Sequence, residues 1–427
     1  MPSKKLVKQN LLASVLIGIT TFCLYTCMYA VRKPFSALVY DNQQLWGANI
    51  KIWMVLAQLL GYTLSKFYGI KKLGTIKKED RSVFLLIVLV CATIPLFIMQ
   101  FADMKFWPLL MFLNGFPLGL VWGIVFSYVE GRRFTELIGA MLACTFVFSS
   151  GWVKSFGLYL QNALHLLNSE VPFYTAIIAL ILAAITLLLL EKLPTPTQED
   201  IQLRNHRTPL STVEQKNFLH KYGFILLPFV FIYGTLTILR DFRDNFSAEL
   251  LTENHAFSTK VFTQMEFKVT LILLAIIPLF SLIKSHKYAL IATNYSILGG
   301  AGVSILSTYL FIHQYIDITI FLMCSGTGFY LGYILINISV MDRLIGYSGQ
   351  SANSGFLIYI ADSVGYLFSL LISSMALLFK DSDAHWTNLY IYILLIGSIA
   401  TVVISLIIIN QINKQKTIST NATIIPT

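Results

Sequence analysis

The chain has 427 residues, of which 56% are hydrophobic and only 12% are charged, and its formal net charge is +10. A soluble domain carries about 25% charged residues, so this composition excludes an ordinary soluble protein and predicts an all-α membrane protein. The positive charge does not indicate a nucleic-acid partner, because lysine and arginine gather in alternate loops whereas the intervening loops are neutral or acidic.

Apolar runs of about 20 residues recur along the chain, and each is long enough to cross a bilayer as a helix. We expect twelve spans, at residues 11–33, 50–70, 83–102, 107–128, 135–157, 173–190, 222–241, 264–284, 287–311, 315–338, 351–379 and 387–410. The alternate placement of basic loops then puts both termini in the cytoplasm, in a multi-pass protein of the cell inner (plasma) membrane.

The spans divide into two sets of six. Residues 1–190 form an amino-terminal half and residues 222–412 a carboxyl-terminal half. Residues 191–221 contain two early prolines and mixed charge, which predicts a cytoplasmic linker, and the polar residues 413–427 predict a disordered tail.

Three landmarks recur between the halves at nearly the same separation. The sequence GFPLG at residues 115–119 returns as GFYLG at 328–332, the FSA triplet at 35–37 returns at 246–248, and Arg32 is matched by Arg240. Repeated halves of this kind predict a transporter whose two halves rock around a central site. Chance recurrence is the alternative, since glycine is common in membrane helices.

The two matched arginines lie on polar helical faces. Tyr25, Tyr29 and Arg32 are spaced so that they share one face of the first span, and Tyr233 and Arg240 repeat the spacing in the seventh. An arginine at membrane depth is costly unless it has a partner or a wet cavity, and a guanidinium can bind an oxyanion through two parallel hydrogen bonds.

The alternative for such residues is that they end their helices and reach the lipid headgroups. We expect this for Lys33 and Arg243, and a functional role for Arg32 and Arg240. Spacing from the tyrosines favours Arg240 as the mate of Arg32, whereas the FSA match favours Arg243.

Several other charges fall within predicted spans. Lys66 and Lys154 either line the cavity or extend to an interface. Asp362, between Tyr359 and Tyr366, is a candidate ion-pair partner or proton site, because a carboxylate at this depth is costly unless it is paired or protonated.

No HExxH motif, serine nucleophile elbow or GxxxxGK[ST] loop is present, and all seven histidines fall in predicted loops. We therefore expect neither an enzyme nor a metal or other cofactor. The five cysteines fall within predicted helices, so a disulfide framework is not expected.

Over nearly its full length the chain resembles the major facilitator superfamily, and within it the organophosphate:phosphate antiporters. The segments that carry the likeness are YAVRKPF at 29–35, SKF at 65–67, and Arg240 followed by DNF at 244–246. The resemblance implies that Arg32 and Arg240 clamp a substrate phosphate while Lys66 adds charge. The charge of these three cations suits a phosphate dianion together with a counter-charge from the substrate or from Asp244. The fifth-helix histidine of that family has no counterpart here.

The resemblance also implies which helices face each other: the second faces the eleventh, and the fifth faces the eighth. We therefore predict two gates, a Lys66–Asp362 pair and a Lys154–Glu266 pair. The expected function is alternating-access transport of a small anionic, phosphorylated metabolite by a monomer in the lipid bilayer, in exchange for inorganic phosphate. The alternatives are a transporter-like sensor and a proton-coupled symporter that uses Asp362 or Asp244.

Overall fold

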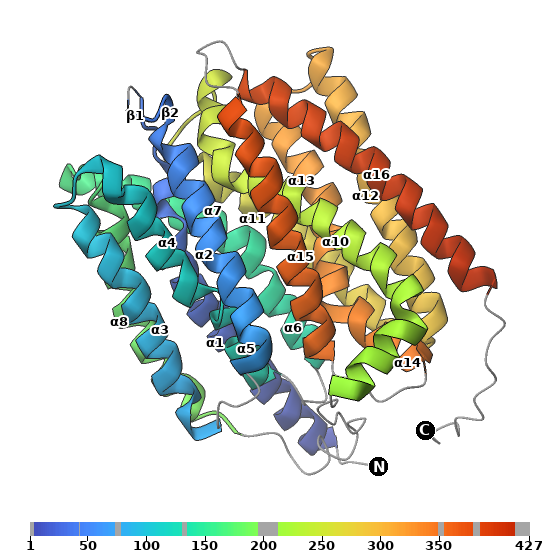
Figure 1. Ribbon diagram of the computed structural model, residues 1–427. Coiled ribbons are helices and arrows are strands. Elements are labelled where there is room, and N and C mark those ends of the chain that lie inside the picture. The colour runs from blue at the N-terminus through green and yellow to red at the C-terminus, as the bar shows by residue number, and fades with distance from the viewer. Residues whose placement is uncertain are drawn as a thin grey trace.

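The computed structural model describes residues 4–41, 43–72, 78–129, 135–194, 212–348, 354–378 and 385–414. Its long helices form one bundle, in which the helices from α1 to α8 lie beside those from α10 to α16 (Figure 1). A two-stranded hairpin, β1 (Gln44–Leu45) and β2 (Ala48–Asn49), stands at one end of the bundle, which we call the hairpin end. The turn of this hairpin holds Trp46 and Gly47, both at positive φ, as a two-residue hairpin turn requires.

The amino-terminal half contains six membrane-crossing segments. Its helices are α1 (Lys4–Arg32), α2 (Ile50–Lys72), α3 (Arg81–Met99), α4 (Trp107–Leu118), α5 (Val121–Val129), α6 (Thr135–Ala143), α7 (Thr145–Leu164) and α8 (Val171–Glu191). Three short 3-10 turns join them, η1 (Pro34–Ala37), η3 (Lys78–Asp80) and η4 (Met104–Phe106). The pairs α4–α5 and α6–α7 each make one crossing with a short interruption, as at Leu120, whose N–H bonds the Pro117 carbonyl.

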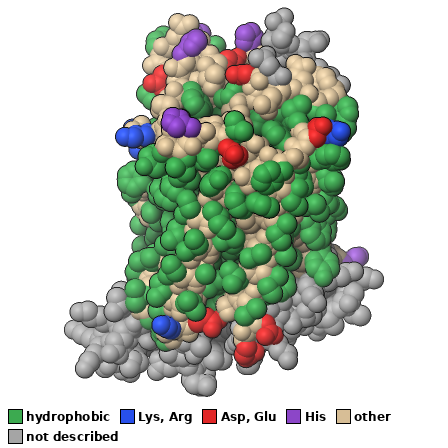
Figure 2. Space-filling model, turned by 90° about the vertical axis from the view of Figure 1, so that its left-hand side faces the viewer, with side chains coloured by type: hydrophobic (Ala, Val, Ile, Leu, Met, Phe, Trp, Pro, Cys, Tyr) green, Lys and Arg blue, Asp and Glu red, His purple; other side chains and the backbone are tan. Residues whose placement is uncertain are grey.

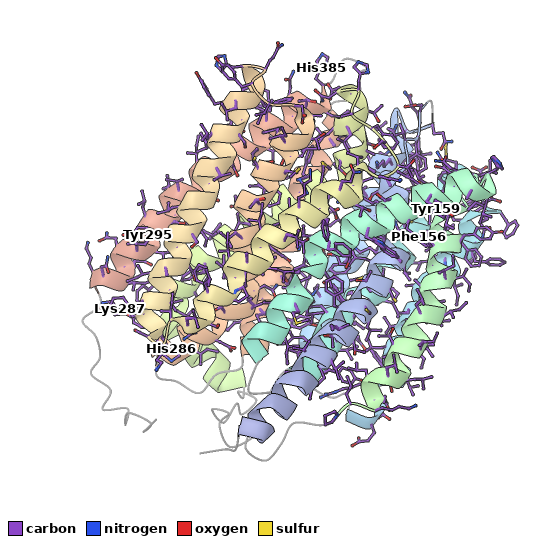
Figure 3. The ribbon with its side chains drawn as sticks, turned by 180° about the vertical axis from the view of Figure 1, so that it is seen from behind. Phe156, Tyr159, His286, Lys287, Tyr295 and His385 are labelled. Atoms are coloured by element: carbon purple, nitrogen blue, oxygen red, sulfur yellow. The ribbon has the colours of Figure 1, made fainter. Side chains whose placement is uncertain are left out.

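The carboxyl-terminal half repeats this arrangement. Its helices are α10 (Thr212–Glu253), α11 (Val261–Ile276), α12 (His286–Ile312), α13 (Ile318–Leu335), α14 (Met341–Ser348), α15 (Ser354–Ser374) and α16 (Trp386–Lys414). The short elements are η5 (Ile277–Leu282), the π-helical turn η6 (Ile336–Val340) and η7 (Met375–Leu378). Figure 3 shows the direction of α12: His286 and Lys287 lie toward the end of the bundle opposite His385.

Ten of the described helical segments are long and apolar enough to cross a membrane. The other two crossings are α2 and α10, and they hold Lys51, Lys66, Arg240 and Arg243 in buried positions. Hydrophobic side chains cover the middle of the face shown in Figure 2, and the described charged side chains gather toward its two ends. The protein is therefore a multi-pass α-helical membrane protein with twelve crossings in two halves, as the sequence predicts.

The two halves meet along the helices expected from the sequence, since α2 packs against α15 and α7 against α11. Gly151 of α7 permits the second contact: a Cβ at this position would come within 2.6 Å of the Phe262 carbonyl oxygen and 2.5 Å of Glu266 Cγ. The halves therefore approach each other closely near the charged residues of α10.

The element bounds differ from the predicted ones mainly at α10. This helix begins at Thr212, inside the predicted linker, and continues to Glu253, twelve residues beyond the predicted end at 241. Phe246 has non-helical φ and ψ within it, so the helix kinks there. Residues 195–211 of the predicted linker and residues 415–427 of the predicted tail lie outside the described residues.

Candidate functional site

Three cations predicted to bind substrate converge on one aromatic ring, that of Tyr366 in α15. The Cζ atoms of Arg32 and Arg240 lie 5.8 and 5.2 Å from the ring centroid, and the Nζ of Lys66 lies 6.0 Å from it. They come from α1, α10 and α2, and each is 4% exposed or less. We call these four residues the Tyr366 cluster.

Arg32 lies with its face on an aromatic ring and its edge free. Its Cζ is 4.0 Å from the centroid of the Tyr62 ring. The guanidinium forms no ion pair or hydrogen bond with another described residue, and its Nε is buried without a partner. Because the N–H donors of arginine point along the edge of the guanidinium, this arrangement leaves them available to an oxyanion.

The end of α1 is fixed by a buried amide network. Gln58 Nε2 donates to the Arg32 carbonyl at 3.0 Å and to Asn114 Oδ1 at 2.7 Å. Asn114 Nδ2 in turn donates to the carbonyls of Val31 and Ala92, at 3.2 and 2.8 Å. These bonds satisfy backbone groups at the last turn of α1 and hold the Arg32 backbone in place.

Arg240, in contrast, is already bound. Its Nε and Nη2 both donate to Asp241 Oδ1, at 3.0 and 2.7 Å, and its Nη1 donates to the Tyr333 hydroxyl. Its Cζ also lies 4.3 Å from the Tyr333 ring centroid. The two arginines are therefore not equivalent, and sequence reasoning missed Asp241. The available signal was an Arg-Asp pair within a predicted span.

A continuous polar chain joins Lys66 to Arg240. Lys66 Nζ lies 2.7 Å from Asp362 Oδ2, and the Tyr233 hydroxyl donates to Asp362 Oδ1. The hydroxyls of Tyr233 and Tyr333 are 2.9 Å apart, with the rings stacked at a centroid distance of 4.9 Å. Asn337, in the π-helical turn η6, donates to the Tyr233 hydroxyl at 2.9 Å. Such π-turns often occur at functional sites.

The predicted ion pair between Lys66 and Asp362 is therefore present, and it joins the two halves. Its role as a gate remains a prediction. The spacing argument placed Tyr233 near Arg240, and the structure connects the two through Tyr333.

Tyr25 and Tyr29 lie in an aromatic cluster beside these residues. The Tyr25 ring packs edge-on against Tyr29, Trp122 and Phe146, at centroid distances of 5.6, 5.2 and 6.0 Å. Phe146 also meets Tyr333 of the other half at 5.5 Å. The predicted contact of Tyr25 and Tyr29 with substrate remains a prediction.

Asp244 is bound by two lysines of the other half, nearer the hairpin end. Lys33 Nζ lies 2.5 Å from Oδ2 and Lys154 Nζ lies 2.7 Å from Oδ1. Ser150 also donates to Oδ1, and Lys33 donates to Asn245 Oδ1 at 2.7 Å.

Two predictions about the charges around Asp244 are wrong. Lys154 does not pair with Glu266, because Asp244 takes Lys154 while Arg243 Nη1 binds Glu266 Oε1 at 2.6 Å. Lys33 and Arg243 do not reach the headgroups either, since they are 2% and 1% exposed and both are ion-paired. Lys33, just after the end of α1, is covered by Asp244 of the opposite half, and α10 continues to Glu253, so Arg243 does not end its helix.

A further cross-half pair lies still nearer the hairpin. Lys51 Nζ is 2.7 Å from Glu249 Oε1 and also donates to the carbonyls of Ser36 and Leu38, at 2.7 and 3.2 Å. Sequence reasoning missed this pair, because a lysine at the second residue of a helix resembles an ordinary helix-end charge.

The family model "Family of unknown function (DUF5690)" matches residues 34–415. The chain belongs to the DUF5690 family. No curated protein matches it.

Solved structures share the fold of this DUF5690 member. A crystal structure of a D-xylose–proton symporter is 14% identical, with a TM-score of 0.63, over 92% of this chain and 96% of that one. The nucleoside transporter NupG is 15% identical, with a TM-score of 0.59, over 95% and 100%. The inward-open xylose transporter XylE from E. coli is 11% identical, with a TM-score of 0.59, over 93% and 95%. The fold is thus that of the major facilitator superfamily.

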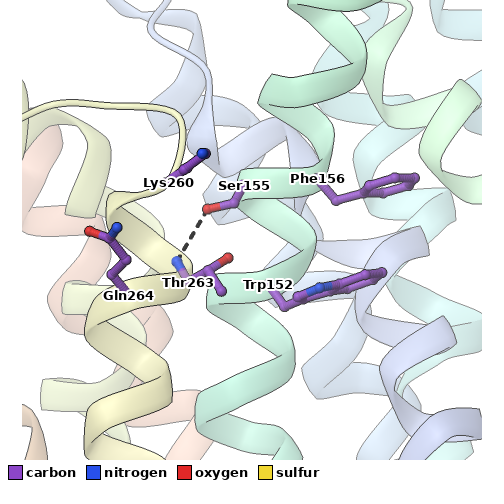
Figure 4. A pocket seen from close by; sticks show the side chains of 6 residues that line it. All are labelled: Trp152, Ser155, Phe156, Lys260, Thr263 and Gln264. Atoms are coloured by element: carbon purple, nitrogen blue, oxygen red, sulfur yellow. Dashed lines mark hydrogen bonds between the residues drawn. The ribbon is translucent and has the colours of Figure 1, made fainter.

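A pocket of about 260 Å³ lies elsewhere in this DUF5690 protein, between α7 and α11. It is lined by Trp152, Ser155, Phe156, Lys260, Thr263 and Gln264. Figure 4 shows the stacked rings of Trp152 and Phe156 on one side and the 3.1 Å bond from Thr263 N to Ser155 Oγ. The pocket shares no lining residue with the Tyr366 cluster, so it is not the predicted binding site.

Proposed function

We propose that this protein is a secondary transporter that moves a small anionic solute by alternating access, with Arg32 as its primary anion-binding residue. The observation that carries the proposal is the state of Arg32: the side chain is 4% exposed, yet no described carboxylate or hydrogen-bond acceptor partners its guanidinium. An uncompensated buried charge costs several kcal/mol, so its presence is explained if the counter-charge arrives with the substrate.

The surrounding charges support the same conclusion. Apart from Arg343, the described buried cations of the bundle number seven, and five carboxylates pair with six of them, with Asp244 shared by two lysines. The surplus of two positive charges suits a dianion such as a phosphate ester. The resemblance of residues 29–35, 65–67 and 240–246 to the organophosphate antiporters favours the same substrate class, in exchange for inorganic phosphate.

The cross-half ion pairs supply a physical basis for alternating access. Each of these pairs among the described residues joins a lysine of the amino-terminal half to a carboxylate of the carboxyl-terminal half. Three of them lie toward the hairpin end, and the fourth, Lys66–Asp362, lies at the edge of the Tyr366 cluster away from the hairpin, where Lys66 is itself a cluster member. Rocking of the halves would break one set while the other stays closed, which opens the cluster to one side at a time.

The same proposal places the protein in the cell inner membrane with its termini in the cytoplasm and the hairpin end outside. The basis is the distribution of basic residues among alternate loops.

Exchange in proteoliposomes tests the proposal. Purified protein is reconstituted into vesicles loaded with labelled phosphate and challenged outside with glycerol 3-phosphate, glucose 6-phosphate, lactate, xylose and uridine. We expect efflux with at least one anion and none with xylose or uridine. Efflux driven by a neutral sugar or nucleoside and by no anion would contradict the proposal.

Two variants assign the result to Arg32. Arg32→Gln should raise the anion concentration that gives half-maximal efflux by about 30- to 5,000-fold. This is the equivalent of 2–5 kcal/mol, the cost of losing a desolvated charge contact. Lys105→Gln is the control, because Lys105 is an exposed cation that pairs with Asp103 at the surface. If the anion concentration for half-maximal efflux stays within about threefold of the wild-type value in both variants, Arg32 does not bind the anion.

A further inference from the structure

Asp241 has one bound and one unbound carboxylate oxygen. Both Arg240 donors, Nε and Nη2, go to Oδ1, at 3.0 and 2.7 Å. Oδ2 accepts no hydrogen bond from a described residue, although the side chain is only 2% exposed. A bidentate arginine–carboxylate pair normally uses both oxygens, so the one-sided geometry leaves a charged acceptor without a donor.

This acceptor belongs to the same group of side chains as the free donors of Arg32. Asp241 is bonded to Arg240, whose Cζ lies 5.2 Å from the centroid of the Tyr366 ring, and the Cζ of Arg32 lies 5.8 Å from the same centroid. The donors come from α1 of one half and the acceptor from α10 of the other. One ring therefore gathers Arg32, which has free donors, and Arg240, whose bound carboxylate has a free acceptor oxygen.

We propose that Asp241 Oδ2 accepts a hydrogen bond from a hydroxyl on the transported anion, so that the site selects oxyanions that carry their own donor. The inference rests on the proposed anion transport and adds a specificity-determining residue to it. An oxyanion without a donor, such as sulfate, would satisfy Arg32 but place its own negative charge against a carboxylate that it cannot bond. A phosphate with a P–OH, or an organic anion with a carbon-bound hydroxyl, would satisfy both groups.

A site built around a buried hydrogen bond discriminates strongly against ligands that lack the partner. For one bond to a charged group we expect a preference of at least about 10-fold. The preference concerns binding and does not require turnover.

Ligand pairs that differ only in the donor test the inference. Full-length protein in detergent is heated with increasing concentrations of each ligand, and Kd is obtained from the rise in unfolding temperature. Inorganic phosphate and sulfate form the first pair, which share a shape but differ in a P–OH. Glycerol 3-phosphate and propyl phosphate form the second, studied at alkaline pH where both phosphates are fully ionised and differ only in carbon hydroxyls.

A preference of about 10-fold or more in either wild-type pair supports the inference. The first pair reports a P–OH donor and the second a carbon-bound hydroxyl. Equal affinities within both pairs would overturn it while leaving anion binding intact. No stabilisation by any of the four anions would overturn the proposed function as well, so the two failures are distinguishable.

The variant Asp241→Asn assigns the preference to this residue, because its amide can donate to sulfate. We expect the preference seen in the wild type to fall to within about threefold. Glu266→Gln is the matched control: Glu266 is also buried, also paired to an arginine through one oxygen, and its Oε2 also lacks a partner. If the Kd ratio within a ligand pair falls equally in both variants, or keeps its wild-type value in Asp241→Asn, the role of Asp241 is contradicted.

Discussion

Lys66 of α2 and Asp362 of α15 form a buried ion pair between the two halves, with Nζ and Oδ2 2.7 Å apart. It is the cross-half pair that the described residues place away from the hairpin end, whereas Asp244 and Glu249 bind three lysines nearer that end. The cross-half ion pairs are thus unequally distributed: three lie toward the hairpin end, and one lies at the opposite edge of the Tyr366 cluster. Asp362 also bonds Tyr233, which bonds Tyr333, which bonds Arg240. Loss of the contact between Lys66 and Asp362 would therefore also change the hydrogen bonds that hold Arg240.

A double-mutant cycle measures the strength of this pair. Lys66→Ala or Asp362→Ala alone leaves an uncompensated buried charge and should destabilise the protein by about 3–5 kcal/mol. The double variant should recover most of that loss, because neither charge remains. Thermal unfolding of the four proteins gives the coupling, and strictly additive losses would show that the two side chains do not interact.

The two arginines of the Tyr366 cluster should respond to neutralisation with opposite signs. Arg32→Gln removes a buried charge without a counter-ion, so the ligand-free protein should unfold at a higher temperature than the wild type. Arg240→Gln leaves Asp241 unpaired and should lower the unfolding temperature. The two substitutions are matched in side-chain chemistry and in burial. A decrease of similar size in both would mean that Arg32 has a compensating partner in the folded protein.

The fold and the two arginines of the Tyr366 cluster could be predicted from sequence for clear physical reasons. Apolar runs of membrane length mark helices regardless of their partners, and a buried charge in such a run must face other polar groups. This reasoning gave the twelve crossings and assigned Arg32 and Arg240 to one site, whereas Lys66 was added to that site only by the family resemblance; the structure places all three over Tyr366. It left open whether Arg240 or Arg243 is the mate of Arg32; the structure places Arg240 over the same Tyr366 ring as Arg32, whereas Arg243 lies over Tyr330.

The pairing of individual charges could not be predicted in the same way. Two cations and two carboxylates lie where α7, α10 and α11 meet: Lys154, Arg243, Asp244 and Glu266. They lie at similar depths in the membrane, so depth alone permits more than one set of ion pairs. The rotation of α10 about its axis decides between them, and periodicity does not fix that rotation for a helix with charges on several faces. Asp241 was missed for a related reason, since its partner is the adjacent Arg240.

The shared carboxylate of Asp244 predicts a rank order of stabilities. Lys33→Met or Lys154→Met leaves Asp244 with the other lysine, so each should have a small effect, within about 1–2 kcal/mol of the wild type. Asp244→Asn leaves two buried lysines without a counter-ion and should cost about 3–5 kcal/mol. Unfolding temperatures of the three variants give the order. A lysine variant less stable than Asp244→Asn would contradict the shared pairing.

The hairpin end must open for solute to enter from that side, so fixing the contact between Lys51 and Glu249 should stop transport. The two residues belong to opposite halves and lie outside the Tyr366 cluster, so Lys51→Cys/Glu249→Cys should transport while its thiols are free. A short, reducible bifunctional thiol reagent should then abolish flux in proteoliposomes, and reduction should restore it. The variant is made in a background without the five native cysteines.

The control for this experiment is Asn254→Cys/Thr387→Cys, since these side chains are bonded at 2.8 Å between α10 and α16 within one half. The same reagent should join this pair and leave flux unchanged, because rigid-body rocking does not alter contacts inside a half. Undiminished flux through the fully cross-linked Lys51–Glu249 variant would show that the halves do not separate at the hairpin end. Loss of flux in both variants would instead indicate movement within the carboxyl-terminal half, which a rigid rocking motion does not produce.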